Sequence, residues 1–258
     1  MRDKFTGFIA IIGTLYIALY VYLTMNIQIW LVDVIHCFKV MEFKVYLIDH
    51  INIFFYIALF FFMSFYISKM LYILFKELYR FYTLNKYISI LKIKRLKNIL
   101  VIDTEEKLAF NFLNKIVISK SILDNFSEEE RKSIFWHEKG HLINGDSYKI
   151  LFSNLILSLF PEKIKNTILK SYILFLETNA DRFALKFIDT VNLAKSLLKF
   201  KSSTSLNPMM NNFTEDRLKT ILEGNNVQIP KFIHVLIILI TAVIFVSIIY
   251  KTCLCGIM

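Results

Sequence analysis

The chain contains 258 residues, which is enough for one or two domains with a sizeable core. Apolar residues make up 56% of it, more than the about 45–50% of soluble domains, and a content of 6 Gly and 3 Pro excludes collagen-like and low-complexity proteins. The 31 basic and 21 acidic side chains give a net charge of +10, and the apolar residues are concentrated in long uncharged runs. This combination indicates a membrane protein, and no base-reading or stacking motif supports a nucleic-acid partner.

The first apolar run extends from Phe5 to Met25, and no charged side chain occurs between Lys4 and Asp33. A helix needs about 20 residues to cross about 30 Å of hydrocarbon, so this run is long enough. A cleaved signal peptide is the competing interpretation, but the run is longer than a signal h-region and no small-x-small cleavage site follows it. We therefore predict a transmembrane helix over residues 5–25.

Two further runs have the composition of membrane spans. The second covers residues 51–75 and contains only Lys69 as a charge, and the third covers residues 233–250, with His234 as its one ionisable group. Three regions are therefore predicted: a transmembrane hairpin (1–75), a water-exposed domain (76–230), and a transmembrane helix with a short tail (231–258). The mixed segment 30–48 is consistent either with an interfacial helix or with part of an additional hairpin.

The charges between the spans predict an orientation. Residues 26–50 carry three acidic and two basic side chains, whereas residues 76–97 carry seven basic side chains and Glu77 as their one acid. Short basic flanks remain in the cytoplasm, so we expect a multi-pass protein of the cell (plasma) membrane whose 76–230 domain is cytoplasmic. The first loop would then lie outside, and the basic segment would also contact anionic lipid.

The most informative motif is HEKGH, an HExxH pattern whose histidines are His137 and His141. A capping box at residues 127–130 and an Asn-Gly stop signal at 144–145 predict that a helix carries it. On a helix the two histidines lie one turn apart, so both imidazoles can bind one metal ion, for which zinc is favoured. Glu138 would reach a water molecule at the ion and not the ion itself.

A catalytic zinc ion needs a third protein ligand, and no third histidine follows at the metzincin spacing. Glu177 is the best candidate, because it lies in a helical stretch 36 residues after His141, which leaves room for an antiparallel return. Asp181 follows one turn later on the same face and could accept the spare N–H of a liganding histidine. The competing carboxylates lack such neighbours: Glu162, Asp189 and Glu215.

Together these residues resemble the membrane-bound gluzincin metallopeptidases. The HExxH pattern, Asp146 five residues later and the sequence Glu177-x-x-Ala180-Asp181 look like peptidase families M56 and M48. Residues 109–119 also resemble the edge strand that, in these families, lies beside the active-site cleft and pairs with an extended substrate. The likeness covers about residues 100–222. We place the chain first in M56, with M48 as the close second, because few spans flank a predicted cytosolic zinc domain.

The resemblance implies a fold and a set of roles. The expected fold is a mainly α integral membrane protein with about three transmembrane helices and a cytosolic zincin-like α+β domain, which contains the HExxH helix and a small edge strand. The implied roles are metal ligation of one Zn²⁺ by His137, His141 and Glu177, catalysis by Glu138 and Arg217, support by Asp181 and Asp146, and substrate pairing by Ile116, Val117 and Ile118.

Arg217 matches an arginine that helps to stabilise the oxyanion in M48 members. The His-Pro pair that precedes it there is absent, however, and Asn211 stands six residues before Arg217. An ion pair between Arg217 and Asp181 or Asp146 is therefore an equally good interpretation of this residue.

We hypothesise an integral-membrane zinc endopeptidase that cleaves a protein or peptide near the cytoplasmic membrane face. The M56 receptors also carry a large extracellular sensing domain after their last span, whereas only eight residues follow Tyr250 here. A signalling role would therefore need a sensor or regulator protein as partner. The alternative hypothesis is a non-catalytic, zinc-stabilised signalling or scaffold protein, although a purely structural zinc site would need no base such as Glu138.

Overall fold

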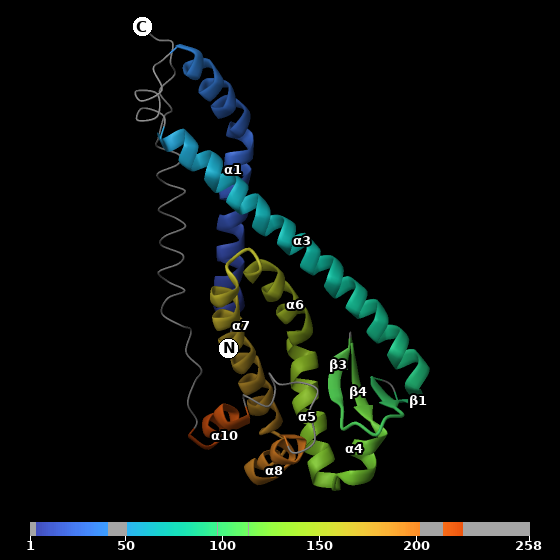
Figure 1. Ribbon diagram of the computed structural model, residues 1–258. Helices are drawn as coiled ribbons and strands as arrows, with labels where there is room; N and C mark the ends of the chain where they lie inside the picture. Colours follow the sequence, from blue (N-terminus) through green and yellow to red (C-terminus); the bar gives the residue numbers. More distant parts are fainter. Residues whose placement is uncertain (1–3, 41–50, 97, 113, 202–213, 224–258) are drawn as a thin grey trace. The chain divides into compact units, whose positions relative to one another are not determined.

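The computed structural model describes residues 4–40, 51–96, 98–112, 114–201 and 214–223 (Figure 1). The chain divides into two compact units, and each is described by itself. Among the described residues, unit 1 contains 4–40, 51–75 and 153–165, and unit 2 contains 76–152, 166–201 and 214–223. The predicted third span, residues 233–250, lies outside the described residues.

Unit 1 contains helix α1 (Lys4–Val40) and the first part of helix α3 (Ile51–Leu91). Both helices are longer than the spans predicted at 5–25 and 51–75. No Gly or Pro occurs between residues 14 and 40, so no helix-breaking residue ends α1 after the apolar run. The segment 30–48, for which two interpretations were open, is helical up to Val40, and its remainder lies outside the described residues.

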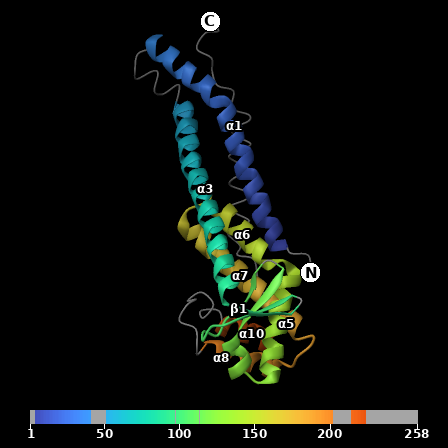
Figure 2. The ribbon, with the colours of Figure 1, turned by 90° about the vertical axis from the view of Figure 1, so that its right-hand side faces the viewer.

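One face of α1 packs against other elements of unit 1. Its buried residues recur every three or four positions, as expected for one helix stripe: Phe5, Ile9, Ile12, Tyr16, Leu19 and Leu23. The Tyr16 hydroxyl donates to the Met63 carbonyl of α3 over 3.4 Å, and the rings of Tyr20 and Phe60 stack at 5.6 Å. These contacts hold α1 and the first part of α3 side by side (Figures 1 and 2).

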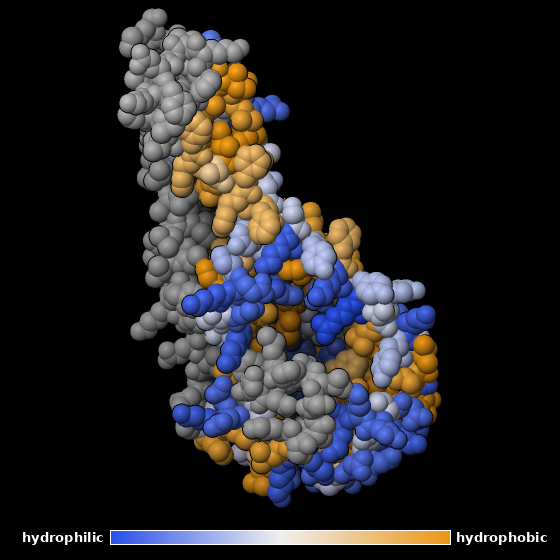
Figure 3. Space-filling view, viewed as in Figure 1, coloured by the Kyte–Doolittle hydropathy of each residue, from blue (hydrophilic) through white to orange (hydrophobic). Residues whose placement is uncertain are grey.

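The remaining faces of these helices are apolar and exposed. On α3 the residues Phe61, Phe62 and Phe65 are 64%, 53% and 66% exposed, and Figure 3 shows hydrophobic side chains along the visible surface of this helical region. By length and composition, the stretches Phe5–His36 and Ile53–Leu91 are able to cross a membrane. Two such helices among the described residues give weak support for membrane association.

Unit 2 contains a four-stranded sheet. Its strands are β1 (Lys92–Leu96), β2 (Ile99–Ile102), β3 (Ala109–Phe112) and β4 (Lys115–Ser119), in the order β1-β2-β4-β3. Strands β2 and β4 pair in parallel, whereas the β1–β2 and β3–β4 pairs are antiparallel. The two faces of the sheet bury different clusters, because alternate residues of β4 point to opposite sides.

The prediction of a substrate edge strand at Ile116, Val117 and Ile118 is wrong. These residues form β4, which is paired with β2 on one side and with β3 on the other, so its backbone groups are already used within the sheet. Residues 109–112 and 115–119 form two antiparallel strands and not a single one. The edge strand of this hairpin is β3, which therefore takes the place that the sequence analysis gave to β4.

Six described helices follow the sheet in the chain, as the predominantly helical expectation requires: α4 (Lys120–Asn125), α5 (Glu128–Asn144), α6 (Asp146–Leu157), α7 (Glu162–Ala184), α8 (Thr190–Lys201) and α10 (Thr214–Glu223). Within unit 2, α5 contacts β3, β4 and α8. The side chains of Ile116, Ile118 and Ile134 form a core between β4 and α5, while Val117 packs on the other face with Ile88 of α3. This core fixes α5 beside the hairpin.

Candidate metal-binding active site

Helix α5 carries the HExxH residues, and its two ends confirm the predicted start and stop. The Ser127 side chain accepts a hydrogen bond from the Glu130 backbone N–H over 3.3 Å, and the Glu130 carboxylate accepts one from the Ser127 N–H over 2.8 Å. Gly145 ends the helix in the left-handed region at φ 67°, which costs a glycine little. These local signals therefore determine where α5 begins and ends. His137 and His141 lie four residues apart within it, so they share one face of the helix.

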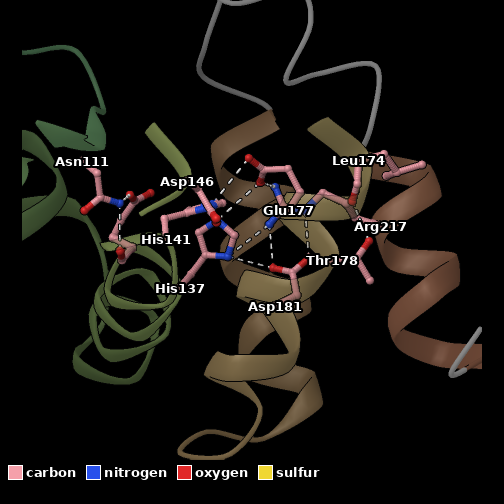
Figure 4. A network of polar contacts seen from close by, with 10 residues as sticks. Asn111, His137, His141, Asp146, Leu174, Glu177, Thr178, Asp181 and Arg217 are labelled. Carbon is pink, nitrogen blue, oxygen red and sulfur yellow. Dashed lines mark hydrogen bonds and ion pairs between the residues drawn. The ribbon is translucent and has the colours of Figure 1, made fainter. Parts of the chain in front are cut away.

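His137, His141 and Glu177 lie together, with one donor atom from each within 4.8 Å of the others. The two histidine Nε2 atoms are 3.1 Å apart, and the Glu177 oxygens lie 3.4 Å from His137 Nε2 and 3.5 Å from His141 Nε2 (Figure 4). Ligands at about 2.0–2.1 Å from a tetrahedral ion are about 3.3 Å from one another. The three side chains can therefore hold one metal ion.

The other nitrogen of each histidine contacts a carboxylate. Asp181 Oδ1 lies 2.9 Å from His137 Nδ1, and Asp146 Oδ2 lies 2.8 Å from His141 Nδ1. An N–H donated from Nδ1 to a carboxylate leaves the Nε2 lone pair free for a metal ion. The structure thus places both predicted supporting carboxylates where they select this tautomer.

Arg217 reaches the site from α10. Its Nε and Nη2 atoms donate to the two oxygens of Asp181 over 2.9 and 2.6 Å, and its Nη1 atom lies 2.9 Å from Glu177 Oε2. Of the two ion-pair partners considered for Arg217, the structure shows Asp181, whereas Asp146 contacts His141 instead. Arg217 is buried and directed at the carboxylates in Figure 4.

Close packing between α5 and α7 brings Glu177 to the histidines. A Cβ atom placed on Gly140 would lie 3.2 Å from the Cα of Ala180 and 3.3 Å from its carbonyl oxygen. Such distances are tighter than nine in ten real Cβ contacts, so Gly140 is needed for this approach. The small residues at 140 and 180, one on each helix, allow the metal-facing side chains to meet.

Burial and the neighbouring charges act in opposite directions on these groups. Burial lowers the pKa of His141, but the Glu177 and Asp146 carboxylates outweigh it and raise that pKa well above the ordinary value. Burial raises the pKa of Glu177, but Arg217 and His141 hold it well below the ordinary range. Burial raises the pKa of Glu138 despite the two histidines. His141 and Glu177 thus shift each other's pKa in the direction that favours the charged form of each.

Asn111 is a site residue that the sequence analysis did not single out. Its side-chain amide on β3 donates to the Glu138 carboxylate Oε2 and to the Glu138 backbone carbonyl, each over 2.8 Å. Asn111 precedes Glu138 by 27 residues and belongs to no motif with it. The contact becomes visible only once β3 is placed beside α5 in the fold.

The model of peptidase family M48 matches residues 82–200 of the chain. This region includes the HExxH residues, Glu177 and Asp181, and the match supports an M48 metallopeptidase. Family M56, the first choice of the sequence analysis, is not confirmed. Arg217 lies outside the matched region. No curated protein matches the chain.

Proposed function

We propose that the protein is an integral-membrane zinc-dependent endopeptidase that cleaves a protein or peptide substrate near the cytoplasmic face of the cell membrane. The observation that carries the proposal is the grouping of His137, His141 and Glu177 at mutual distances of 3.1–3.5 Å, with Glu138 on the same helix as the histidines. The match to a peptidase family over the same residues supports a hydrolytic role.

Zinc is the metal that the donor set favours. Two imidazole nitrogens and one carboxylate are the ligands of catalytic zinc in His₂Glu sites, which leave one position for water or substrate. The Glu177 carboxylate is buried, and its two oxygens lie 3.4 and 3.5 Å from the Nε2 atoms of the two histidines, so it faces the place where the ion would bind. When bound, zinc would supply the Lewis acidity that polarises a carbonyl group and acidifies water.

The chain itself supplies the proton transfer. Glu138 would accept the proton of the attacking water and later donate it to the leaving amine. Burial raises its pKa, which brings the base closer to the neutral range where proton transfer in both directions is efficient. Arg217 holds Glu177 and Asp181 in place, and its proposed help to the oxyanion would use the N–H groups that these carboxylates leave unused.

An extended substrate would pair with β3. The Ser119 N–H donates to the Leu108 carbonyl over 2.9 Å, so Leu108 faces β4. Because backbone groups alternate in direction along an antiparallel strand, those of Ala109 and Asn111 point to the free edge of the hairpin. A peptide could add there as a further strand next to the HExxH helix.

The exposed apolar helices support a membrane location. Burial of the exposed phenylalanines of α3 in lipid removes a patch that a soluble protein would rarely leave in water. The seven basic residues between 76 and 97 follow the apolar part of α3 and favour a cytoplasmic position for the peptidase unit. Substrates would then be membrane proteins or peptides at the inner leaflet, and a sensor or regulator protein could trigger their cleavage.

The test of the activity is the Glu138→Gln variant. It removes the base and keeps nearly the same shape, so zinc should remain bound while cleavage of casein by the detergent-purified protein falls about 10²–10⁴-fold. Zinc content by mass spectrometry and product formation by chromatography measure the two effects.

The Glu129→Gln variant is the matched control, since Glu129 lies on the exposed first turn of the same helix. It should retain both zinc and activity. Wild-type biological activity in the Glu138→Gln variant would favour the alternative function, a non-catalytic zinc-stabilised signalling or scaffold protein.

A further inference from the structure

We propose that Asn111 is a positioning residue that holds the carboxylate of Glu138 in the orientation required of the base. This inference rests on the proposed peptidase function. It concerns a side chain on β3 that no part of the HExxH pattern contains.

The strand register places Asn111 on the correct face of the sheet. Asn111 pairs with Ile116, and cross-strand partners share one face, so both residues face α5, where Ile116 packs against Ile134. Phe112, the next residue of β3, belongs to the cluster on the opposite face with Val117. The period-2 alternation of β3 therefore directs the Asn111 amide at the HExxH helix.

In the contact between Asn111 and Glu138, the amide of Asn111 is the donor. The Asn111 Nδ2 group donates to Glu138 Oε2 over 2.8 Å and to the Glu138 carbonyl over 2.8 Å (Figure 4). Both neighbours are acceptors, so the amide cannot be turned the other way without placing oxygen against oxygen. One side chain thus binds the reacting carboxylate and the backbone of the same residue, which fixes the carboxylate relative to the helix axis.

The other end of the amide indicates a role beyond stability. Asn111 Oδ1 is buried and has no hydrogen-bond partner among the described residues. A buried acceptor without a donor destabilises the folded protein, so this residue is not the one that stability alone would favour at that place. Holding the Glu138 carboxylate accounts for the presence of the amide.

The experiment compares Asn111→Ala and Asn111→Asp in the full-length protein in detergent. The alanine variant removes the donor, and the nearly isosteric aspartate also places a second carboxylate against Glu138. Charge-assisted hydrogen bonds contribute about 1.5–3 kcal/mol, so kcat should fall about 10- to 100-fold in the alanine variant and further in the aspartate variant. Zinc content and KM should change little. Asn114→Ala, at an exposed asparagine in the turn of the same hairpin, is the matched control.

A second measurement does not depend on a cleaved substrate. Acetohydroxamic acid binds zinc and gives up its hydroxyl proton to a neighbouring base, so its affinity by calorimetry should fall about 10-fold in both Asn111 variants and in Glu138→Gln. Imidazole, which binds zinc without using the base, should bind all variants equally.

The outcomes separate the two proposals. Unchanged kcat and hydroxamate affinity in zinc-loaded Asn111 variants would overturn the positioning role. Loss of zinc or of folding in both variants would assign the amide to the fold and would overturn it as well. A wild-type protein that binds zinc and hydroxamate but cleaves nothing would overturn the peptidase function alone, and the hydroxamate comparison would still decide the role of Asn111.

Discussion

At the scale of single residues, the described part of the site buries more carboxylates than there are lysine and arginine side chains beside them. Four carboxylates are buried there, those of Glu138, Asp146, Glu177 and Asp181, and the cations that face them are the guanidinium of Arg217 and the ammonium of Lys149, 3.6 Å from Asp146 Oδ1. Buried charges are tolerated when they are paired or bind metals. A divalent cation bound by His137, His141 and Glu177 would add positive charge beside these carboxylates.

The third metal ligand is tested by metal content. Glu177→Ala should leave only His137 and His141 as ligands, so the protein should no longer retain stoichiometric zinc during purification. Glu162→Ala is the control, because Glu162 is on the same helix but exposed and paired with Lys69 at 2.8 Å. Mass spectrometry on both purified variants gives the answer, and full zinc occupancy in Glu177→Ala would contradict the assignment.

The two other carboxylates that competed with Glu177 in the sequence have different positions in the structure. Asp189 Oδ1 accepts a hydrogen bond from the Asn192 N–H over 2.6 Å at the start of α8, and Glu215 is exposed on α10. Glu177 lies beside the two histidines, and the features that favoured it, a carboxylate one turn later and small residues for close approach, are local to one helix.

Asn111 and the edge strand could not be predicted in the same way. The order β1-β2-β4-β3 depends on parallel pairing between β2 and β4, which are separated in sequence by β3. No local pattern encodes that choice, so residues 109–119 were interpreted as one strand and β4 was assigned the exposed edge. A contact between Asn111 and Glu138 follows only after the hairpin and α5 are placed.

At the scale of elements, two features position the site residues: where helix α5 begins and ends, and how closely α5 packs against α7. The capping box and Gly145 fix where α5 begins and ends, and these signals are short-range, so they were readable from the sequence. The ends of α1 were less readable, because Asp33 interrupts the apolar run without stopping the helix. A charged residue such as Asp33 can end the apolar run of a predicted span, but it does not end the helix, whereas Gly and Pro destabilise a helix interior.

The approach of α5 to α7 is tested by Gly140→Ala. At an ordinary helix position this change stabilises by about 1 kcal/mol, but here the new Cβ would meet the Ala180 backbone at 3.2 Å. Overpacking against a backbone costs about 1–3 kcal/mol, so we expect a lower melting temperature and weaker zinc binding. Gly7→Ala is the control, since no atom lies within 4 Å of its Cβ. A stabilised, fully zinc-loaded Gly140→Ala protein would show that the two helices can separate without harm.

At the scale of the whole molecule, the amino-acid composition has two separate causes. The apolar excess includes helices whose outward faces remain hydrophobic, as with the exposed phenylalanines of α3, and these faces agree with the proposed membrane location. The net charge of +10 owes much to residues 76–97, directly after the apolar part of α3. At the proposed membrane location, a basic segment at this place would set the direction of insertion, and the charge would need no nucleic-acid partner.

The orientation of the protein in the membrane can be measured with fusions at two positions. If basic flanks remain inside, a fluorescent protein that folds only in the cytoplasm should be bright when it is fused after Lys97. A phosphatase that is active only outside should work when it is inserted between Asp33 and Asp49, where the acidic residues exceed the basic ones by one. Replacing Lys76, Arg80 and Lys86 by Gln should weaken both signals, because it removes three of the seven basic residues. The reverse pattern would place the peptidase unit outside the cell, and it would exclude substrates at the inner leaflet while leaving the chemistry of the site unchanged.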